Sequence, residues 1–144
     1  MNKTFRGQIA NDGKETIRLS TNNGLTGYRM MKFELMPATP ESANEEATLQ
    51  IFTDEESATL ALGSGAIDFR NPQLLAAAFY SGSATATTNP EDSIVIFDNI
   101  TFNQDIYITC KSSANMNYHI SLEQIKLDLT QATVATLKDM RGRE

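Results

Sequence analysis

The stretch that decides the fold is NYHISLEQIKLDL, residues 117–129, in which hydrophobic and polar residues alternate. Such a period of two is typical of a β-strand with one face toward a core and the other toward water. The hydrophobic residues fall into two sets that would face opposite sides of that strand: Tyr118, Ile120 and Leu122, then Ile125, Leu127 and Leu129. Because a strand cannot exchange its faces without an extra residue, we predict a β-bulge or a corner near Glu123 and Gln124.

Shorter stretches with the same pattern lie along the rest of the chain and are separated by turn residues. They predict strands at 5–10, 15–20, 31–35, 47–53, 94–97 and 106–110. The first two flank Asn11-Asp12-Gly13-Lys14, a composition typical of a tight turn, so we expect them to form a hairpin. Residues 74–80 follow the helix-like start Asn71-Pro72, but they lie between strands and we predict a strand there.

The strand count, about eight at regular spacing, predicts an all-β fold, an antiparallel β-sandwich of jelly-roll type with short terminal arms. We expect a single domain over residues 1–144, with candidate arms at 1–10 and 130–144. In the second segment Val134, Leu137 and Met140 recur every three residues, which fits a short helix or a docking arm. Residues 81–93 are small and polar and predict an exposed loop. The expected core consists of Met31, Phe33, Leu35, Leu49, Ile51, Ile94, Ile96, Ile106, Ile108, Ile120 and Leu122.

Composition narrows the class of protein. The chain has 144 residues and a formal net charge of −6, which argues against a surface that neutralises nucleic-acid phosphates or binds anionic lipid. We therefore expect no nucleic-acid partner and no membrane partner. The sequence shows neither a signal-peptide pattern nor a run of about 18 apolar residues, so we expect a soluble protein made in the cytoplasm.

Candidate nucleophiles and bases are few, since the chain has one cysteine, Cys110, and one histidine, His119. Strand alternation places Cys110 on the same face as Ile106 and Ile108, as a small core residue. His119 faces away from Tyr118 and Ile120, toward solvent or a subunit contact. The spacing brings no third orienting group to this pair, so we do not expect it to be catalytic.

The acidic residues of the loops are the other candidates for chemistry. They could serve as acid/base groups or calcium ligands, but they match no known ligand spacing, and we interpret them as solvated charges: Asp54, Glu55, Glu56, Glu91 and Asp92. Gly63-Ser64-Gly65 lacks the third glycine of a phosphate-binding loop. The chain has no tryptophan and its four tyrosines are scattered, which weighs against a carbohydrate platform. We expect no enzyme activity, no catalytic residues, no cofactor and no metal.

Several stretches together carry a resemblance to a known group of proteins. The last third contains IFDNITFNQDIYIT at 96–109, the stretch 117–129 quoted above, and ATLKDMR at 135–141. The first third contains TFRG at 4–7, TGYR at 26–29 and KFEL at 32–35. In these stretches the chain resembles small virion structural proteins of marine tailed phages, including cyanophages.

The resemblance implies a component of the phage particle. It favours a capsid decoration (cement) protein that binds the outside of the assembled head, with the major capsid protein as partner and a homo-oligomer, a trimer, as its own state. The implied location is the capsid exterior of the virion, after synthesis in the host bacterial cytoplasm. Two alternatives stay open: a structural component of the tail, collar or fibre base, and a β-sandwich module that binds a glycan or receptor.

Overall fold

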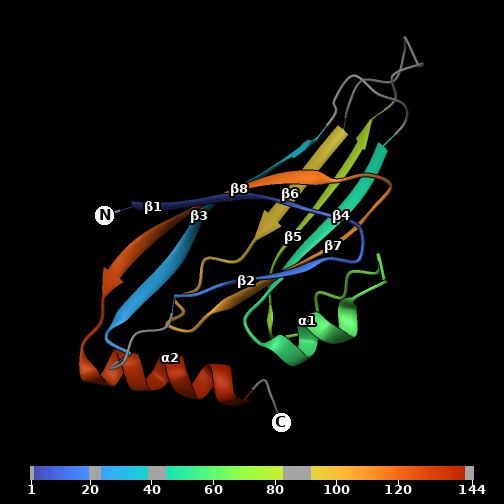
Figure 1. Cartoon of the computed structure of the whole chain (residues 1–144). Coiled ribbons are helices and arrows are strands. Elements are labelled where there is room, and N and C mark those ends of the chain that lie inside the picture. Colours follow the sequence, from blue (N-terminus) through green and yellow to red (C-terminus); the bar gives the residue numbers. More distant parts are fainter. Residues whose placement is uncertain (1, 20–23, 39–44, 83–91, 142–144) are drawn as a thin grey trace.

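The computed structural model describes residues 2–19, 24–38, 45–82 and 92–141. Within these residues, eight strands and two helices follow one another: β1 (Asn2–Ile9), β2 (Lys14–Ile17), β3 (Thr26–Pro37), β4 (Glu45–Phe52), α1 (Glu55–Ala61), β5 (Leu74–Gly82), β6 (Asp92–Phe97), β7 (Ile106–Ser112), β8 (Met116–Lys126) and α2 (Leu129–Arg141). The strands form two antiparallel sheets packed face to face, which confirms the predicted all-β sandwich (Figure 1). Sheet A has the order β1-β8-β3, and sheet B has the order β2-β7-β4-β5-β6.

The strand pairing follows the jelly-roll pattern, in which an antiparallel ribbon of strand pairs is wound around a core. Three of its four pairs are present as hydrogen-bonded ladders: β1 with β8, β2 with β7, and β4 with β5. The fourth pair differs, because β6 stays hydrogen-bonded to β5 and only packs near β3. Sheet B therefore ends in β6 as an edge strand, which matters for the surface described below.

The predicted hairpin between β1 and β2 is wrong. The two strands belong to different sheets, with β1 on β8 and β2 on β7. The turn between them is held by β7 instead: Asp12 donates its backbone N–H to the Cys110 carbonyl at 2.9 Å, and Cys110 donates to the Gly13 carbonyl at 3.1 Å. The turn is thus a corner between sheets, and the first candidate arm, residues 1–10, is largely strand β1.

The predicted bulge lies on a different strand from the one expected. β8 runs from Met116 to Lys126 with continuous pairing to β1, whereas the register of β3 against β8 shifts between Met30 and Lys32. Met31 is the extra residue, so Met30 faces the core and Met31 is 48% exposed. No switch of face is needed on β8, because Ile125 is only half-buried and Leu127 is buried beyond the end of the strand.

The core lies between the two sheets, where most of the expected residues are found. Seven of them are fully buried: Phe33, Leu49, Ile51, Ile106, Ile108, Ile120 and Leu122. Leu35 is half-buried and packs against this core. Besides Met31, two expected core residues are wrong, since Ile94 is 52% and Ile96 is 48% exposed. On β6 their neighbours Val95 and Phe97 pack against the core instead.

The segment after β4 forms a helix that the sequence analysis did not predict. Glu55 and Glu56 lie in the first turn of α1, where negative charge favours the positive end of the helix dipole. Ala58 is fully buried and packs with Phe52 and Leu74 in a small second core on the outer face of sheet B. The predicted strand at 74–80 is confirmed as β5. Residues 83–91, the greater part of the predicted loop 81–93, lie outside the described residues.

The C-terminal segment forms α2, which is the short helix rather than the docking arm of the two alternatives that the spacing of Val134, Leu137 and Met140 allowed. Its first turn is a capping box: the Asp128 carboxylate accepts from the backbone N–H of Gln131 at 2.7 Å, and the Gln131 side chain accepts from that of Asp128 at 3.1 Å. Asn103, which is 1% exposed, donates its side-chain amide to Thr136 Oγ1 at 3.0 Å and to the Gly24 carbonyl at 3.1 Å. This amide ties α2 across the end of the sandwich (Figure 1).

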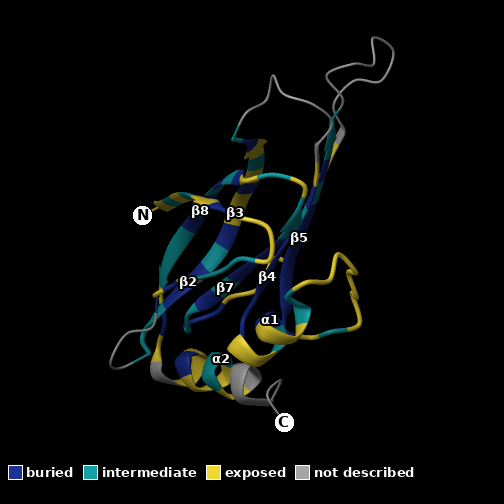
Figure 2. Cartoon of the chain, turned by 45° about the vertical axis from the view of Figure 1, so that its right-hand side comes forward, coloured by how far each residue is buried: buried dark blue, intermediate teal, exposed yellow. Residues whose placement is uncertain are grey.

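Figure 2 shows how burial follows this architecture. The strand surfaces that face each other are buried, whereas both helices expose much of their surface. On α2, Val134 and Leu137 are 47% and 49% exposed. Among the described residues, no helix is long and apolar enough to cross a membrane.

Candidate functional site

Cys110 and His119 lie on different sheets, and their side chains point in different directions. Cys110 is on β7 and points into the core, as predicted, and its Sγ donates to Ser112 Oγ at 3.4 Å. Burial raises the pKa of the Cys110 thiol, which keeps it protonated and poorly nucleophilic. His119 is on β8 of the other sheet and faces outward, away from the core. The structure therefore does not bring the two side chains together.

The acidic candidates lie in different surroundings. Glu55 is exposed and forms an ion pair with Lys14 at 3.1 Å, and Glu56 is exposed beside it. Asp54 is 1% exposed, and its Oδ1 has no hydrogen-bond partner among the described residues. Glu91 lies outside the described residues. Gly63-Ser64-Gly65 is part of an exposed segment that follows α1.

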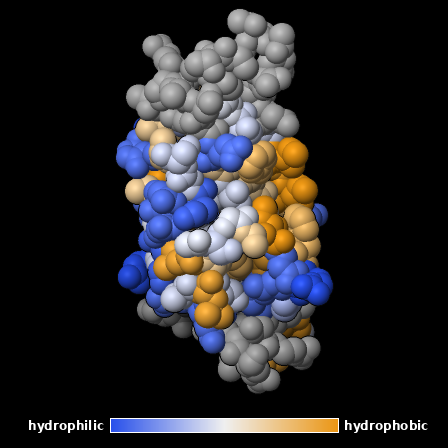
Figure 3. Space-filling model, turned by 90° about the vertical axis from the view of Figure 1, so that its right-hand side faces the viewer, coloured by the Kyte–Doolittle hydropathy of each residue, from blue (hydrophilic) through white to orange (hydrophobic). Residues whose placement is uncertain are grey.

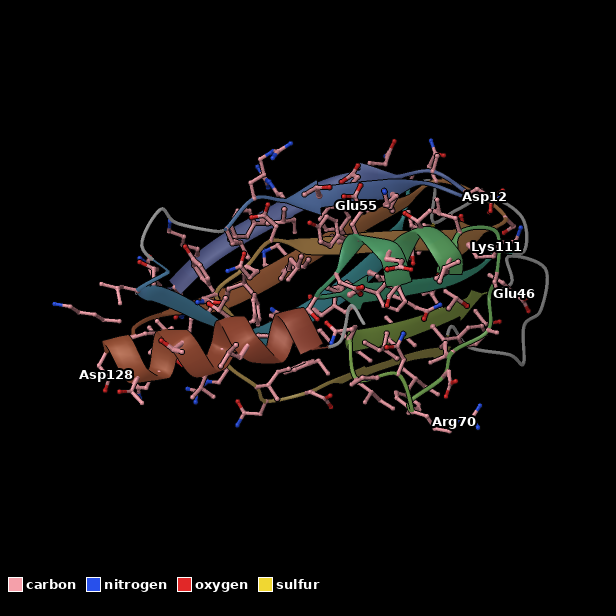
Figure 4. All side chains as sticks on the ribbon, turned by 90° about the horizontal axis from the view of Figure 1, so that it is seen from below. Asp12, Glu46, Glu55, Arg70, Lys111 and Asp128 are labelled. Atoms are coloured by element: carbon pink, nitrogen blue, oxygen red, sulfur yellow. The ribbon has the colours of Figure 1, made fainter. Side chains whose placement is uncertain are left out.

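Other charged side chains lie around the outside of the sandwich (Figure 4). Asp12 has a positive φ of 60°, and its carboxylate meets Lys111 Nζ at 3.4 Å next to the corner between β1 and β2. Glu55 and Asp128 lie at the two helices, well separated from this pair. These groups are scattered rather than convergent, so they form no site.

A set of polar side chains does converge on the outer face of sheet A. Residues directly opposite one another on β1, β8 and β3 form cross-strand rows on this face. One row is Arg6, His119 and Glu34, and the next is Gln8, Asn117 and Met36. Side chains in such rows lie close enough to contact one another, since opposite Cβ atoms are about 4.5–5.5 Å apart.

These two rows line a shallow, open depression of about 690 Å³. All of its lining residues come from sheet A: Arg6, Gly7, Gln8, Glu34, Leu35, Met36, Asn117, Tyr118 and His119. Gln8 Nε2 donates to Asn117 Oδ1 at 3.1 Å, and the Nδ1 of His119 is buried with no hydrogen-bond partner among the described residues. We call this the sheet A depression.

Sequence reasoning placed His119 toward solvent but did not find this depression. Its members come from residues 6–8, 34–36 and 117–119, and only the antiparallel register brings them together. The available signal was a concentration of polar residues at alternate positions on each strand. Without knowing that β8 lies between β1 and β3, no sequence pattern could align them.

Tyr118 lies on the opposite face of the same strand and joins the two sheets. Its hydroxyl donates to Glu15 Oε2 on β2 at 2.5 Å. Burial, together with the neighbouring Glu15 carboxylate, raises the pKa of Tyr118 well above its ordinary value of 10.0. Gly7 makes room for this side chain, because a Cβ at that position would lie 2.8 Å from the Tyr118 hydroxyl.

Tyr118→Phe is expected to lower the free energy of unfolding by about 1.5–3 kcal/mol, because Glu15 loses the hydroxyl that satisfies its charge. The raised pKa also sets a sign for pH dependence: the folded protein keeps the Tyr118 proton that the unfolded chain releases, so this contribution to stability falls as pH rises above 10.0. Urea unfolding at neutral pH and above pH 10 measures both effects. An equally steep alkaline loss in the wild type and in Tyr118→Phe would contradict the assignment.

A second distinct surface lies at the β6 edge of sheet B. Ile94 and Ile96 point outward there, and each lies opposite a residue of β5, Phe79 and Ala77 respectively. The segment after α1 crosses the same face, since Gln50 donates to the Ala66 carbonyl at 3.1 Å. That segment exposes Phe69 by 66%. We call Phe79, Ile94 and Ile96 the β6 strip. Figure 3 shows hydrophobic residues gathered along one side of this view of the molecule.

Comparison with known proteins adds no assignment to these two surfaces. No protein-family model matches the chain, and no curated protein matches it significantly.

Proposed function

We propose that this protein is a capsid decoration protein that binds the outside of an assembled phage head and stabilises it through non-covalent contacts. The resemblance of the sequence to virion structural proteins of marine tailed phages supports the particle assignment. The jelly-roll sandwich also supports this assignment, because a compact domain of this kind can present a large rigid surface for non-covalent contacts. The partner in this proposal is the major capsid protein.

The observation that carries the proposal is the β6 strip. An edge strand normally carries charged residues or proline where it would otherwise pair with another chain. β6 instead presents two half-exposed isoleucines on its outer face, and the described pairing uses only its β5 side. An apolar edge is a surface that a protein partner would cover. We propose that it is buried against the capsid or against another copy of this chain in a trimer.

The net charge of −6 suits a protein–protein role at the outside of a head better than contact with packaged nucleic acid. The polar outer face of sheet A would then remain on the solvent side of the particle. A tail, collar or fibre-base location remains the alternative proposal, since the same strip could be covered there.

Co-sedimentation of the purified protein with tail-less mature capsids and, separately, with free tails tests the proposal. We expect saturable binding to capsids at many copies per particle and no binding to tails. Binding to tails or portals alone would overturn the capsid assignment. Sedimentation equilibrium of the free protein gives its oligomeric state, and a monomer at all concentrations would overturn the trimer.

A further inference from the structure

The sheet A depression has features of a ligand site that the decoration role does not require. Its centre is β8, whose backbone is hydrogen-bonded to β1 on one side and to β3 on the other. An incoming chain therefore cannot add a strand at this place. A ligand in the depression must therefore be recognised by the side chains of the depression, without hydrogen bonds to the strand backbone.

The Arg6 guanidinium in the lining favours an anionic group. The Arg6 side chain is exposed and has no ion pair or hydrogen bond with any other described residue. The one carboxylate in the lining, Glu34, is compensated by Lys32 at 3.3 Å. The lining thus holds one cation and one carboxylate, and the carboxylate already has a partner in Lys32 outside the lining, which leaves the Arg6 guanidinium as the unpaired charge. A guanidinium presents a planar fork of donors that matches a carboxylate.

Two amide side chains of the depression, Gln8 and Asn117, can bind hydroxyls. The Asn117 amide accepts from Gln8 through its oxygen and keeps its own N–H donors free to act on a ligand. The Nδ1 of His119 is buried and has no hydrogen-bond partner among the described residues, so it is not presented to a ligand in the depression. The 60% exposed Met36 adds an apolar wall for C–H groups.

Size and chemistry together indicate a small saccharide. The volume of about 690 Å³ falls within the range of about 300–1,000 Å³ common for small-molecule sites. We propose that the sheet A depression binds a hexuronic acid residue of an acidic saccharide, with Arg6 pairing the carboxylate and Gln8 and Asn117 bonding the ring hydroxyls. This inference does not rest on the capsid proposal, because it concerns the opposite side of the sandwich and the free protein.

Titration of the ¹⁵N-labelled protein with digalacturonic acid, followed by amide chemical shifts, tests the site. We expect saturable shifts confined to the residues of the depression. The neutral dimethyl ester of the same disaccharide is expected to bind at least about tenfold more weakly, because it lacks the charge that Arg6 pairs with.

Two matched variants separate this site from general attraction of an anion. Arg6→Gln is expected to weaken binding of digalacturonic acid by at least about tenfold, whereas Arg18→Gln, which removes the same charge from an exposed position outside the depression, should leave it unchanged. Unchanged thermal unfolding of both variants shows that the fold is retained.

Three results would overturn the proposal. The first is an absence of shifts at saturating disaccharide, and the second is an equal loss of affinity in the two arginine variants. The third is binding of an acidic hexaglutamate peptide in the depression as tightly as the sugar acid, which would assign the site to a peptide instead. Each can occur whether or not the protein binds capsids, so failure here and failure of the decoration role are distinguishable.

Discussion

Replacement of both Ile94 and Ile96 by lysine is expected to weaken binding to tail-less capsids by at least about a hundredfold, on the basis of the proposed decoration role. Each substitution places a charge where an apolar partner surface would cover the β6 strip, and an unpaired buried charge is costly. The fold should be retained, because both side chains are half-exposed and Val95 and Phe97 still anchor β6 in the core. Capsid co-sedimentation with increasing protein gives the affinities.

Met31→Lys is the matched control for this experiment. Met31 is 48% exposed, the same fraction as Ile96, but it lies at the bulge of β3 in the other sheet. We expect this variant to bind capsids like the wild type. If Met31→Lys were as defective as the double variant, or if the double variant bound normally, the β6 strip would not be the contact surface.

Ile120→Ala is expected to lower the free energy of unfolding by about 3–5 kcal/mol, a large part of the 5–15 kcal/mol typical of a domain. Ile120 is completely buried at the middle of β8, the central strand of sheet A. It lies opposite Phe5 on one side and Phe33 on the other. Truncation would leave a cavity that side chains on two neighbouring strands cannot readily fill. Urea unfolding monitored by circular dichroism measures the loss.

Ile125→Ala on the same strand provides the comparison. Ile125 is only half-buried, near the end of β8, so we expect a loss of less than about 1.5 kcal/mol. The contrast tests the continuity of β8 directly. If the sequence-based expectation of a face switch at Glu123 and Gln124 were correct, Ile125 would be a core residue, and the two alanine variants would lose similar stability.

The two β6 residues that were wrongly expected in the core, Ile94 and Ile96, show where strand patterns lose information. Ile94, Val95, Ile96 and Phe97 are all apolar, so alternation cannot say which parity faces inward. Packing of Val95 and Phe97 across from Ala78 and Ala76 decides it. The four consecutive apolar residues could have indicated that one pair stays exposed.

The helix α1 shows a second limit of prediction from local sequence. Asp54-Glu55-Glu56 is equally suited to ending a strand with charge and to starting a helix with acidic residues in its first turn. The burial of Ala58 against Phe52 and Leu74 on the outer face of sheet B stabilises the helical form. For α2, the capping box of Asp128 and Gln131 was a local signal that sequence reasoning could have used.

The sequence by itself determined the all-β class, the position of nearly every strand and the burial of Cys110, because strand periodicity and turn residues are local properties. Only the tertiary structure decided the partners of β1 and β2, the bulge at Met31, the exposure of Ile94 and Ile96, and the assembly of the sheet A depression. These features depend on which strands lie side by side. That choice is made by packing between residues far apart in the chain, which no local pattern encodes.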